Sequence, residues 1–299
     1  MVLPARPLIL VALAFAAPAG ARRPPPPPDL GAVTLDRTDP AVEARVAGVS
    51  ARLAVVLDDG VFLAPAFADH VPLAWEKAGY EEVGRVRVAY RDAAAEVAVA
   101  GVARPMRVTV HEGPCCAGHD GAIGAADLPW SVVRIGRGGT SPEQRFPAAS
   151  DDQSGLNIPW RVGNGIIHVV LSPDLPETVA TASAAAMLAK AYGGHFEGTA
   201  RQASLAFGVT REVRDMALDR PAPVLGFRLE RIAVRLADFE GSGKLPQDKA
   251  GEGILVRHAP QAPQHGWAAI TIGRDLLGRC PLISVYRDEA LIGLVCDPA

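Results

Sequence analysis

The chain repeats one order of segments, and this repeat constrains its fold more than any other feature. Each half contains an apolar run, an acidic turn and a late Ile-Gly-x-x-x-Leu pattern. In the first half the apolar run is Leu53–Leu57, the acidic turn is Asp58-Asp59-Gly60, and the late pattern starts with Ile123-Gly124. In the second half the apolar run is Ile166–Leu171, the acidic turn is Ser172-Pro173-Asp174, and the late pattern starts with Ile272-Gly273. A repeated unit of this kind predicts two similar lobes in tandem.

Short β-rich runs, broken by Gly, Pro and Asp, are far commoner in the chain than helical periodicity. They predict a mainly β protein. The expected strands include Ala44–Val49, Leu53–Leu57, Val83–Tyr90, Glu96–Val102, Met106–Val110 and Val132–Ile135. Two short helices are expected, over Ala64–Val71 and over the Ala-rich segment Thr181–Ala191.

Asp58 stands directly after an apolar run that has the character of a buried strand. A carboxylate at the tip of such a strand costs free energy unless it has a function. Asp-Asp-Gly is also an ordinary turn sequence, so the motif alone identifies no site. Its place in a repeated order favours a fold in which this loop forms a site. The repeat does not favour activity at that site.

The repeated order resembles that of the retropepsin/pepsin-like aspartic peptidases. In that family each lobe has a strand, an Asp-Thr/Ser-Gly loop, a flap hairpin and a late apolar-apolar-Gly segment beneath the loop. The resemblance covers roughly residues 40 to 297, as two tandem lobes. It implies a mainly β, two-lobed aspartic-peptidase-like (acid protease) β-barrel fold with a few short helices and a cleft between the lobes.

The resemblance assigns the first-lobe active-site loop to Asp58, Asp59 and Gly60. Asp58 matches the catalytic Asp, and Gly60 matches the Gly whose missing side chain lets the backbone turn. Asp59 departs from the family's Thr or Ser, whose hydroxyl locks the two loops together. An ionised carboxylate only accepts hydrogen bonds, so this departure puts the lock in doubt.

The second active-site loop departs further from the family. Counting back from Thr178 places Ser172 at the catalytic position, and the nearest acid, Asp174, lies two positions later. Ser172 cannot act as an acid–base partner at ordinary pH. Pro173 restricts the backbone rearrangement that catalysis by Asp174 would need.

Peptide hydrolysis in this family uses two carboxylates that share one proton. We therefore expect an aspartic-peptidase-like protein with weak or lost endopeptidase activity, acting on a peptide or protein in the inter-lobe cleft without metal or organic cofactor. The alternative is a non-catalytic pseudopeptidase of the cell envelope that binds an extended peptide by strand addition. A purely structural envelope protein is a third possibility.

A further hairpin and the cysteines complete the candidate residues. Val86–Val99, with a turn at Arg91-Asp92-Ala93-Ala94, is interpreted either as the first-lobe flap with Tyr90 near its tip or as a plain exposed hairpin. Cys280 and Cys296 are placed symmetrically about Asp288, which predicts a disulfide across paired strands.

The adjacent residues Cys115 and Cys116 leave the disulfide connectivity open, because four cysteines allow three pairings. With His111 and His119 they have the residue types of a zinc site, but the spacing matches no common one. A loop with a disulfide is the preferred interpretation.

The N-terminus has the pattern of an export signal, and four cysteines fit an oxidising compartment. Residues 1–21 are interpreted as a signal peptide and 22–39 as a Pro-rich linker, followed by the first lobe (40–139), a connection (140–160) and the second lobe (161–299). We expect a periplasmic or secreted protein with no stable membrane span after cleavage; a retained anchor is the alternative. The net charge of −3 argues against a nucleic-acid partner.

Overall fold

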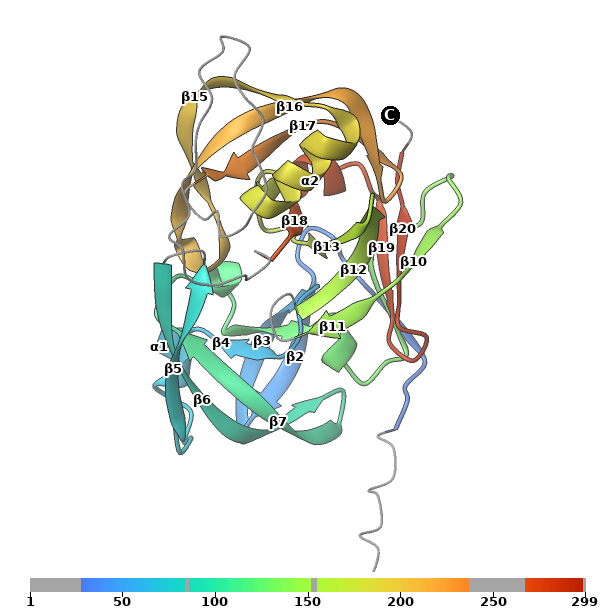
Figure 1. The fold of residues 1–299 in the computed structure, drawn as a ribbon. Helices are drawn as coiled ribbons and strands as arrows, with labels where there is room; N and C mark the ends of the chain where they lie inside the picture. The colour runs from blue at the N-terminus through green and yellow to red at the C-terminus, as the bar shows by residue number, and fades with distance from the viewer. Residues whose placement is uncertain (1–27, 84–85, 152–154, 237–266, 298–299) are drawn as a thin grey trace, which may run out of the picture.

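The computed structural model describes residues 28–83, 86–151, 155–236 and 267–297. The expected signal peptide, residues 1–21, lies outside the described residues. The described chain is mainly β and forms two lobes joined by a five-stranded sheet (Figure 1). It has a closed barrel in the first lobe and a few short helices, so the expected fold class is confirmed.

The first lobe is built on a seven-stranded sheet with the order β2-β3-β8-β4-β7-β6-β5. Its strands are β2 (Ala41–Val46), β3 (Val49–Val56), β4 (Val61–Leu63), β5 (Lys77–Val83), β6 (Val86–Val99), β7 (Val102–His111) and β8 (Gly121–Gly124). A further pairing of β2 with β6 closes the barrel. The helical segments are α1 (Pro65–Ala68), η1 (Cys116–Gly118) and η2 (Ala125–Asp127).

The second lobe has eight strands with the order β11-β12-β13-β18-β14-β17-β16-β15. They are β11 (Ala149–Asp151), β12 (Gly155–Val162), β13 (Gly165–Leu171), β14 (Val179–Thr181), β15 (His195–Ser204), β16 (Thr210–Val224), β17 (Phe227–Arg235) and β18 (Ala269–Ile272). The helical segments are α2 (Ala182–Tyr192), η3 (Ala206–Gly208) and α3 (Arg274–Leu277).

The two lobes share one strand arrangement, which is the structural counterpart of the sequence repeat. In the first lobe β8 lies between β3, parallel to it, and β4, antiparallel to it, and β4 pairs in parallel with β7. In the second lobe β18 lies in the same way between β13 and β14, and β14 pairs in parallel with β17. The loops β3–β4 and β13–β14 therefore occupy corresponding places.

The joining sheet takes strands from both halves of the chain. Its order is β1 (Ala32–Leu35), β9 (Val132–Gly136), β19 (Leu282–Tyr286), β20 (Leu291–Val295) and β10 (Gln144–Pro147). The predicted disulfide between Cys280 and Cys296 is present at the base of the β19–β20 hairpin.

Two segments that the sequence interprets as connections contain strands. Strand β1 lies inside the segment 22–39 that was interpreted as a linker, and β10, β11 and most of β12 lie inside the connection 140–160. These strands are short and partly exposed, so they lack the apolar alternation that reveals a strand. Their pairing partners, not their own sequences, make them strands.

The expected turn at residues 91–94 is also wrong. Strand β6 runs unbroken from Val86 to Val99 and pairs with β5 from Val86 opposite Val83 onward. Tyr90 therefore lies within the strand, opposite His111 and against Gly79, and not at a flap tip. Arg91 and Asp92 pair with Ala78 and Lys77 of β5 and with Val110 and Thr109 of β7, so they lie inside the strand.

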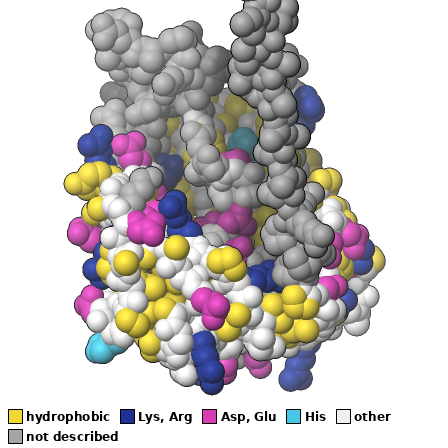
Figure 2. All heavy atoms as spheres, turned by 90° about the horizontal axis from the view of Figure 1, so that it is seen from below, with side chains coloured by type: hydrophobic (Ala, Val, Ile, Leu, Met, Phe, Trp, Pro, Cys, Tyr) yellow, Lys and Arg dark blue, Asp and Glu magenta, His cyan; other side chains and the backbone are white. Residues whose placement is uncertain are grey.

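The Ala-rich helix is where the sequence predicts it. The side chain of Thr181 caps α2 by accepting from the backbone of Ala184, and Gly193 follows its end at φ 74°. One apolar cluster extends through both lobes and includes the buried face of α2. Figure 2 shows that the face seen from below mixes apolar, acidic and basic side chains. Among the described residues, none of the helices is long and apolar enough to cross a membrane.

Candidate functional site

Asp58 lies in the tight loop between β3 and β4. Its Oδ1 accepts a hydrogen bond from the backbone of Asp59 at 2.9 Å. Gly60 adopts φ +95°, a left-handed conformation that favours glycine, and its N–H donates to Asp127 Oδ2 at 2.6 Å. Gly124 packs beneath this loop so closely that a Cβ there would overlap the carbonyl oxygen of Asp58. The late Ile-Gly segment therefore supports the loop, as the sequence pattern indicates.

The surroundings of Asp58 enclose its carboxyl without removing it from solvent. The residue keeps an exposed surface, yet protein encloses its carboxylate on most sides. This burial raises the pKa of Asp58 to about 6; the Asp59 N–H lowers it, the charges of Asp59 and Glu81 raise it, and His111 lowers it. Burial also raises the pKa of Asp127. Asp58 is thus a water-accessible carboxyl that titrates near neutral pH.

Asp59 contacts the second lobe. Its Oδ2 accepts a hydrogen bond from the hydroxyl of Ser150 on β11. In the same hairpin, Gly155 lies so close to Asp58 that a Cβ would overlap Oδ1. The acid in place of the family's hydroxyl therefore finds a donor across the lobe boundary, and this contact joins the Asp58 loop to the second lobe.

Two hairpins cross between the lobes and meet on the left of Figure 1. The first-lobe hairpin β5–β6 packs its apolar side chains on the second lobe. This inter-lobe cluster consists of Val83 and Val88 from the first lobe and Val179, Ala203, Leu205, Val213 and Ala233 from the second. The β5–β6 hairpin therefore joins the two lobes through this cluster.

The second-lobe hairpin β15–β16 docks on the first lobe in the opposite direction. Phe207, at its tip, stacks on His111 with ring centroids 4.1 Å apart. His111 is buried, and its Nε2 lies 2.7 Å from Glu81 Oε2 on β5. His111 thus contacts both hairpins, and it lies on the strand that leads into the Gly113 loop against Phe207.

The strand register aligns the two active-site loops differently from a count back from Thr178. Val55 pairs with Ile123 in the first lobe, and Leu171 pairs with Ile272 in the second. If the two isoleucines correspond, then Asp174 corresponds to Asp58, and Ser172 corresponds to a strand residue. Asp174 is exposed, and its side chain forms no hydrogen bond or ion pair within the described part of the chain. No contact joins it to Asp58.

Sequence reasoning missed Glu177 in the second loop. Gly273 packs beneath the backbone of Glu177 as Gly124 packs beneath that of Asp58. The Glu177 carboxylate is held by both terminal nitrogens of Arg201, at 2.7 and 2.5 Å. The one available signal was its position directly before Thr178, the residue used to count the loop.

Thr178 holds the loop in place from the other side. Its hydroxyl accepts from the backbone of Gly273 at 3.1 Å and donates to Asp275 at 2.7 Å. Thr178 therefore holds the end of the second loop with its hydroxyl. In the first lobe the corresponding hydrogen bonds are made by the Gly60 backbone and Asp127.

The chain matches no protein-family model and no curated protein. Solved structures do resemble it. One is a protease of EIAV in complex with the inhibitor HBY-793, which is 13% identical over 29% of this chain and 81% of its own, at a TM-score of 0.23. The likeness is distant.

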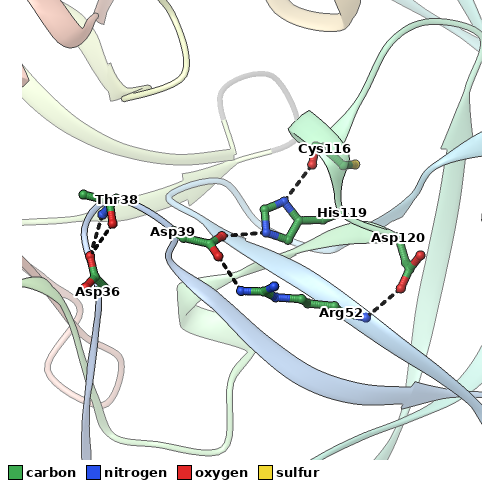
Figure 3. Close-up of polar contacts among 7 residues, drawn as sticks. All are labelled: Asp36, Thr38, Asp39, Arg52, Cys116, His119 and Asp120. Carbon is green, nitrogen blue, oxygen red and sulfur yellow. Dashed lines mark hydrogen bonds and ion pairs between the residues drawn. The ribbon is translucent and has the colours of Figure 1, made fainter.

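The adjacent cysteines pair with each other in the segment between β7 and β8. Figure 3 shows the polar contacts around them: His119 bonds the Cys116 carbonyl at 3.0 Å and Asp39 at 2.8 Å, and Arg52 bonds Asp39. These contacts fix the segment between β7 and β8. Within the described ranges, no group of three His, Cys, Asp or Glu side chains is arranged to hold a metal.

Proposed function

We propose that this chain is an exported aspartic-peptidase-like protein that holds an extended peptide in the cleft between its lobes, with weak or no peptide hydrolysis. The observation that carries the proposal is the inequality of the two loops. Asp58 is a largely enclosed carboxyl with a pKa of about 6, whereas the second loop offers the exposed Asp174 and Glu177, which is bound by Arg201.

The chemistry explains why this inequality matters. In peptide hydrolysis, an ionised carboxylate takes a proton from water while the water oxygen attacks the carbonyl carbon of the peptide. The second carboxyl, which is protonated, donates its proton to the carbonyl oxygen. The C–N bond then breaks, and the amine leaves with a proton. Two carboxyls in contact are needed to hold these two states at once. Asp58 alone supplies only one of these two protonation states at a time.

Binding makes smaller demands than catalysis, and the cleft retains what binding needs. Among the described residues, strand β5 pairs with β6 alone, so its other edge is a sheet edge. An extended peptide can add to such an edge through main-chain hydrogen bonds. The Cys280–Cys296 disulfide is compatible with an oxidising compartment, which supports export.

A working peptidase is the second candidate function. The raised pKa of Asp58 favours it, because a carboxyl that titrates near pH 6 is suited to proton transfer at mildly acid pH. This candidate needs Asp174 to approach Asp58 when a peptide binds.

The test is cleavage of a mixed peptide library from about pH 3 to 7, with and without a transition-state inhibitor of aspartic peptidases. We expect little cleavage, confined to acid pH and lost in Asp58→Asn. Robust, inhibitor-sensitive cleavage that disappears in Asp174→Asn would overturn the proposal in favour of the second candidate.

A further inference from the structure

The β11–β12 hairpin of the second lobe lies directly against the Asp58 loop of the first. The hydroxyl of Ser150 on β11 donates to Asp59 Oδ2, and Gly155 at the start of β12 lies against Asp58 Oδ1. Strand β11 is the end strand of the eight-stranded sheet, and among the described residues it pairs with β12 alone. An end strand of the second lobe therefore contacts the acidic loop of the first.

Gly155 meets two separate requirements at this contact. Its φ of +58° is left-handed, which favours glycine, and a Cβ there would overlap Asp58 Oδ1. The same oxygen accepts the N–H of Asp59 at 2.9 Å. Asp58 keeps an exposed surface, so the hairpin closes off one carboxyl oxygen and leaves the residue in contact with solvent.

A buried asparagine ties the two strands of the hairpin together. Asn157 on β12 has no exposed surface, and its Nδ2 donates to Asp151 Oδ2 at 2.9 Å and to the Gly155 carbonyl at 3.1 Å. On β13, His168 Nδ1 lies 3.1 Å from Asn157 Oδ1. The end of β11 and the start of β12 are thus joined into one unit.

This unit is held against the first lobe by a short strand. Strand β11 has three residues, two of which are exposed, and Ser150 is one of these two. Short edge strands with few buried contacts open locally at a low cost in free energy. We therefore expect the hairpin to move away from Asp58 while both lobes stay folded.

We propose that the β11–β12 hairpin is an autoinhibitory contact, which closes the approach to Asp58 Oδ1 until an extended peptide displaces it. This inference rests on the proposed function and deepens it, because it names the segment with which a peptide competes for Asp58. When only a fraction of the molecules is open, the apparent affinity for the peptide is reduced by that fraction. A substitution that opens the hairpin should therefore strengthen peptide binding.

The first test needs no peptide. The titration of the Asp58 carboxyl, followed by carbon-13 NMR, is measured in Gly155→Ala, whose added methyl group forces the hairpin and the carboxyl apart. Gly163→Ala is the matched control, because Gly163 has φ +57° in the turn between β12 and β13 but no atom within 4 Å of its Cβ position.

Burial is the largest cause of the raised pKa of Asp58, and the charges that face it, Asp59, Glu81 and His111, are the same in all variants. We expect the midpoint, about 6 in the wild type, to fall by at least about one pH unit in Gly155→Ala and to stay unchanged in the control. An unchanged midpoint in Gly155→Ala would overturn the proposal.

The second test measures peptide binding after removal of the hydroxyl. Ser150→Ala keeps the backbone of the hairpin but loses the donor to Asp59, and Ser204→Ala is the control for an exposed serine on β15. The peptide library lacks Lys and Arg, so that the released Asp59 carboxylate does not itself attract the peptides. We expect Ser150→Ala to retain at least about threefold more peptide than the wild type or the control. Equal retention by Ser150→Ala and the wild type would overturn the competition.

Failure of this inference is distinguishable from failure of the proposed function. If neither the wild type nor any variant retains peptide, the proposed function fails, and the titration decides whether the hairpin encloses Asp58. Circular dichroism checks that each variant folds. If Gly155→Ala does not fold, the titration is repeated with Ser150→Ala, in which we expect a fall of at least about half a pH unit. No fall in that variant would contradict the proposal.

Discussion

Asp58 is the residue on which both the sequence argument and the structure converge. The loop around it depends on small, local features: a left-handed Gly60, a hydrogen bond from the neighbouring N–H, and Gly124 beneath the carbonyl. Each requires a particular residue type at a particular position. This is why the loop is readable from the sequence.

The pKa of Asp58 makes the stability of the protein depend on pH. The folded value of about 6 lies above the ~3.9 of an unfolded Asp, so the native state binds more protons between these values. Stability contributed by this group is therefore lost as pH rises from about 4 through about 6. Asn cannot ionise and avoids this loss.

We accordingly expect Asp58→Asn to unfold at a higher denaturant concentration than the wild type at pH 7, and to gain little at pH 4. Urea unfolding at both pH values measures the effect, with Asp174→Asn as the control for the loss of one exposed carboxylate. An Asp58→Asn variant that is less stable than the wild type at pH 7 would show that the charged form is favoured in the fold.

Glu177 and Arg201 were beyond the reach of the sequence for a physical reason. They are 24 positions apart, and the contact exists only because β15 lies near the β13–β14 loop in the folded lobe. Nothing local in either segment requires the partner. Contacts of this kind depend on tertiary structure, whereas the glycines of the Asp58 loop are required by the local backbone geometry.

At the scale of elements, the two crossing hairpins join the lobes. His111 is the point at which they meet, since it bonds Glu81 of β5 and stacks on Phe207 of β15–β16. The sequence indicated His111 only as a member of a weak metal-like cluster. Its partners come from strands that are remote in the chain, so no spacing rule reveals them.

We expect His111→Ala to loosen both hairpins while the lobes stay folded. Amide hydrogen exchange near Glu81–Val83 and Leu205–Val209 should become at least about tenfold faster, because local opening then breaks neither the ring stacking nor the hydrogen bond to Glu81. His119→Ala is the matched control, since His119 bonds Cys116 and Asp39 on the same lobe. Equal acceleration in the control would mean that His111 has no special role at the hairpins.

The elements themselves were predictable to different degrees. The strands around Asp58 and the helix after Thr181 follow from apolar runs and helix propensity, and the repeat supplies their order. The hairpin turn was misplaced because Arg91 and Asp92 look like a turn but lie within β6, where Asp92 is buried. The edge strands β1 and β10 were not predicted from the sequence, because only their pairing partners make them strands.

At the scale of the whole molecule, the five-stranded sheet joins the halves of the chain. Strand β19 pairs with β9 of the first half and with β20. The Cys280–Cys296 disulfide closes the hairpin that carries β19 and β20. A weaker hairpin would therefore weaken the junction between the lobes as well as its own pairing.

We expect Cys280→Ser/Cys296→Ser to lower the free energy of unfolding by about 2–4 kcal/mol, since the bond closes a loop of intermediate length. Cys115→Ser/Cys116→Ser is the control, because a bond between adjacent residues restricts the unfolded chain little. Thermal unfolding of both double variants measures the difference. A larger loss in the control would show that the junction does not depend on the hairpin disulfide.

The most direct test of the account is to follow binding and cleavage of the same peptides together. A mixed peptide library is incubated near pH 5 with the immobilised protein, and bound and released peptides are identified by mass spectrometry. We predict that the wild type and Asp58→Asn retain intact extended peptides, and that Phe207→Asp, which disrupts the docked hairpin, retains far fewer. Release of cleaved peptides by the wild type, or equal retention by Phe207→Asp, would contradict it.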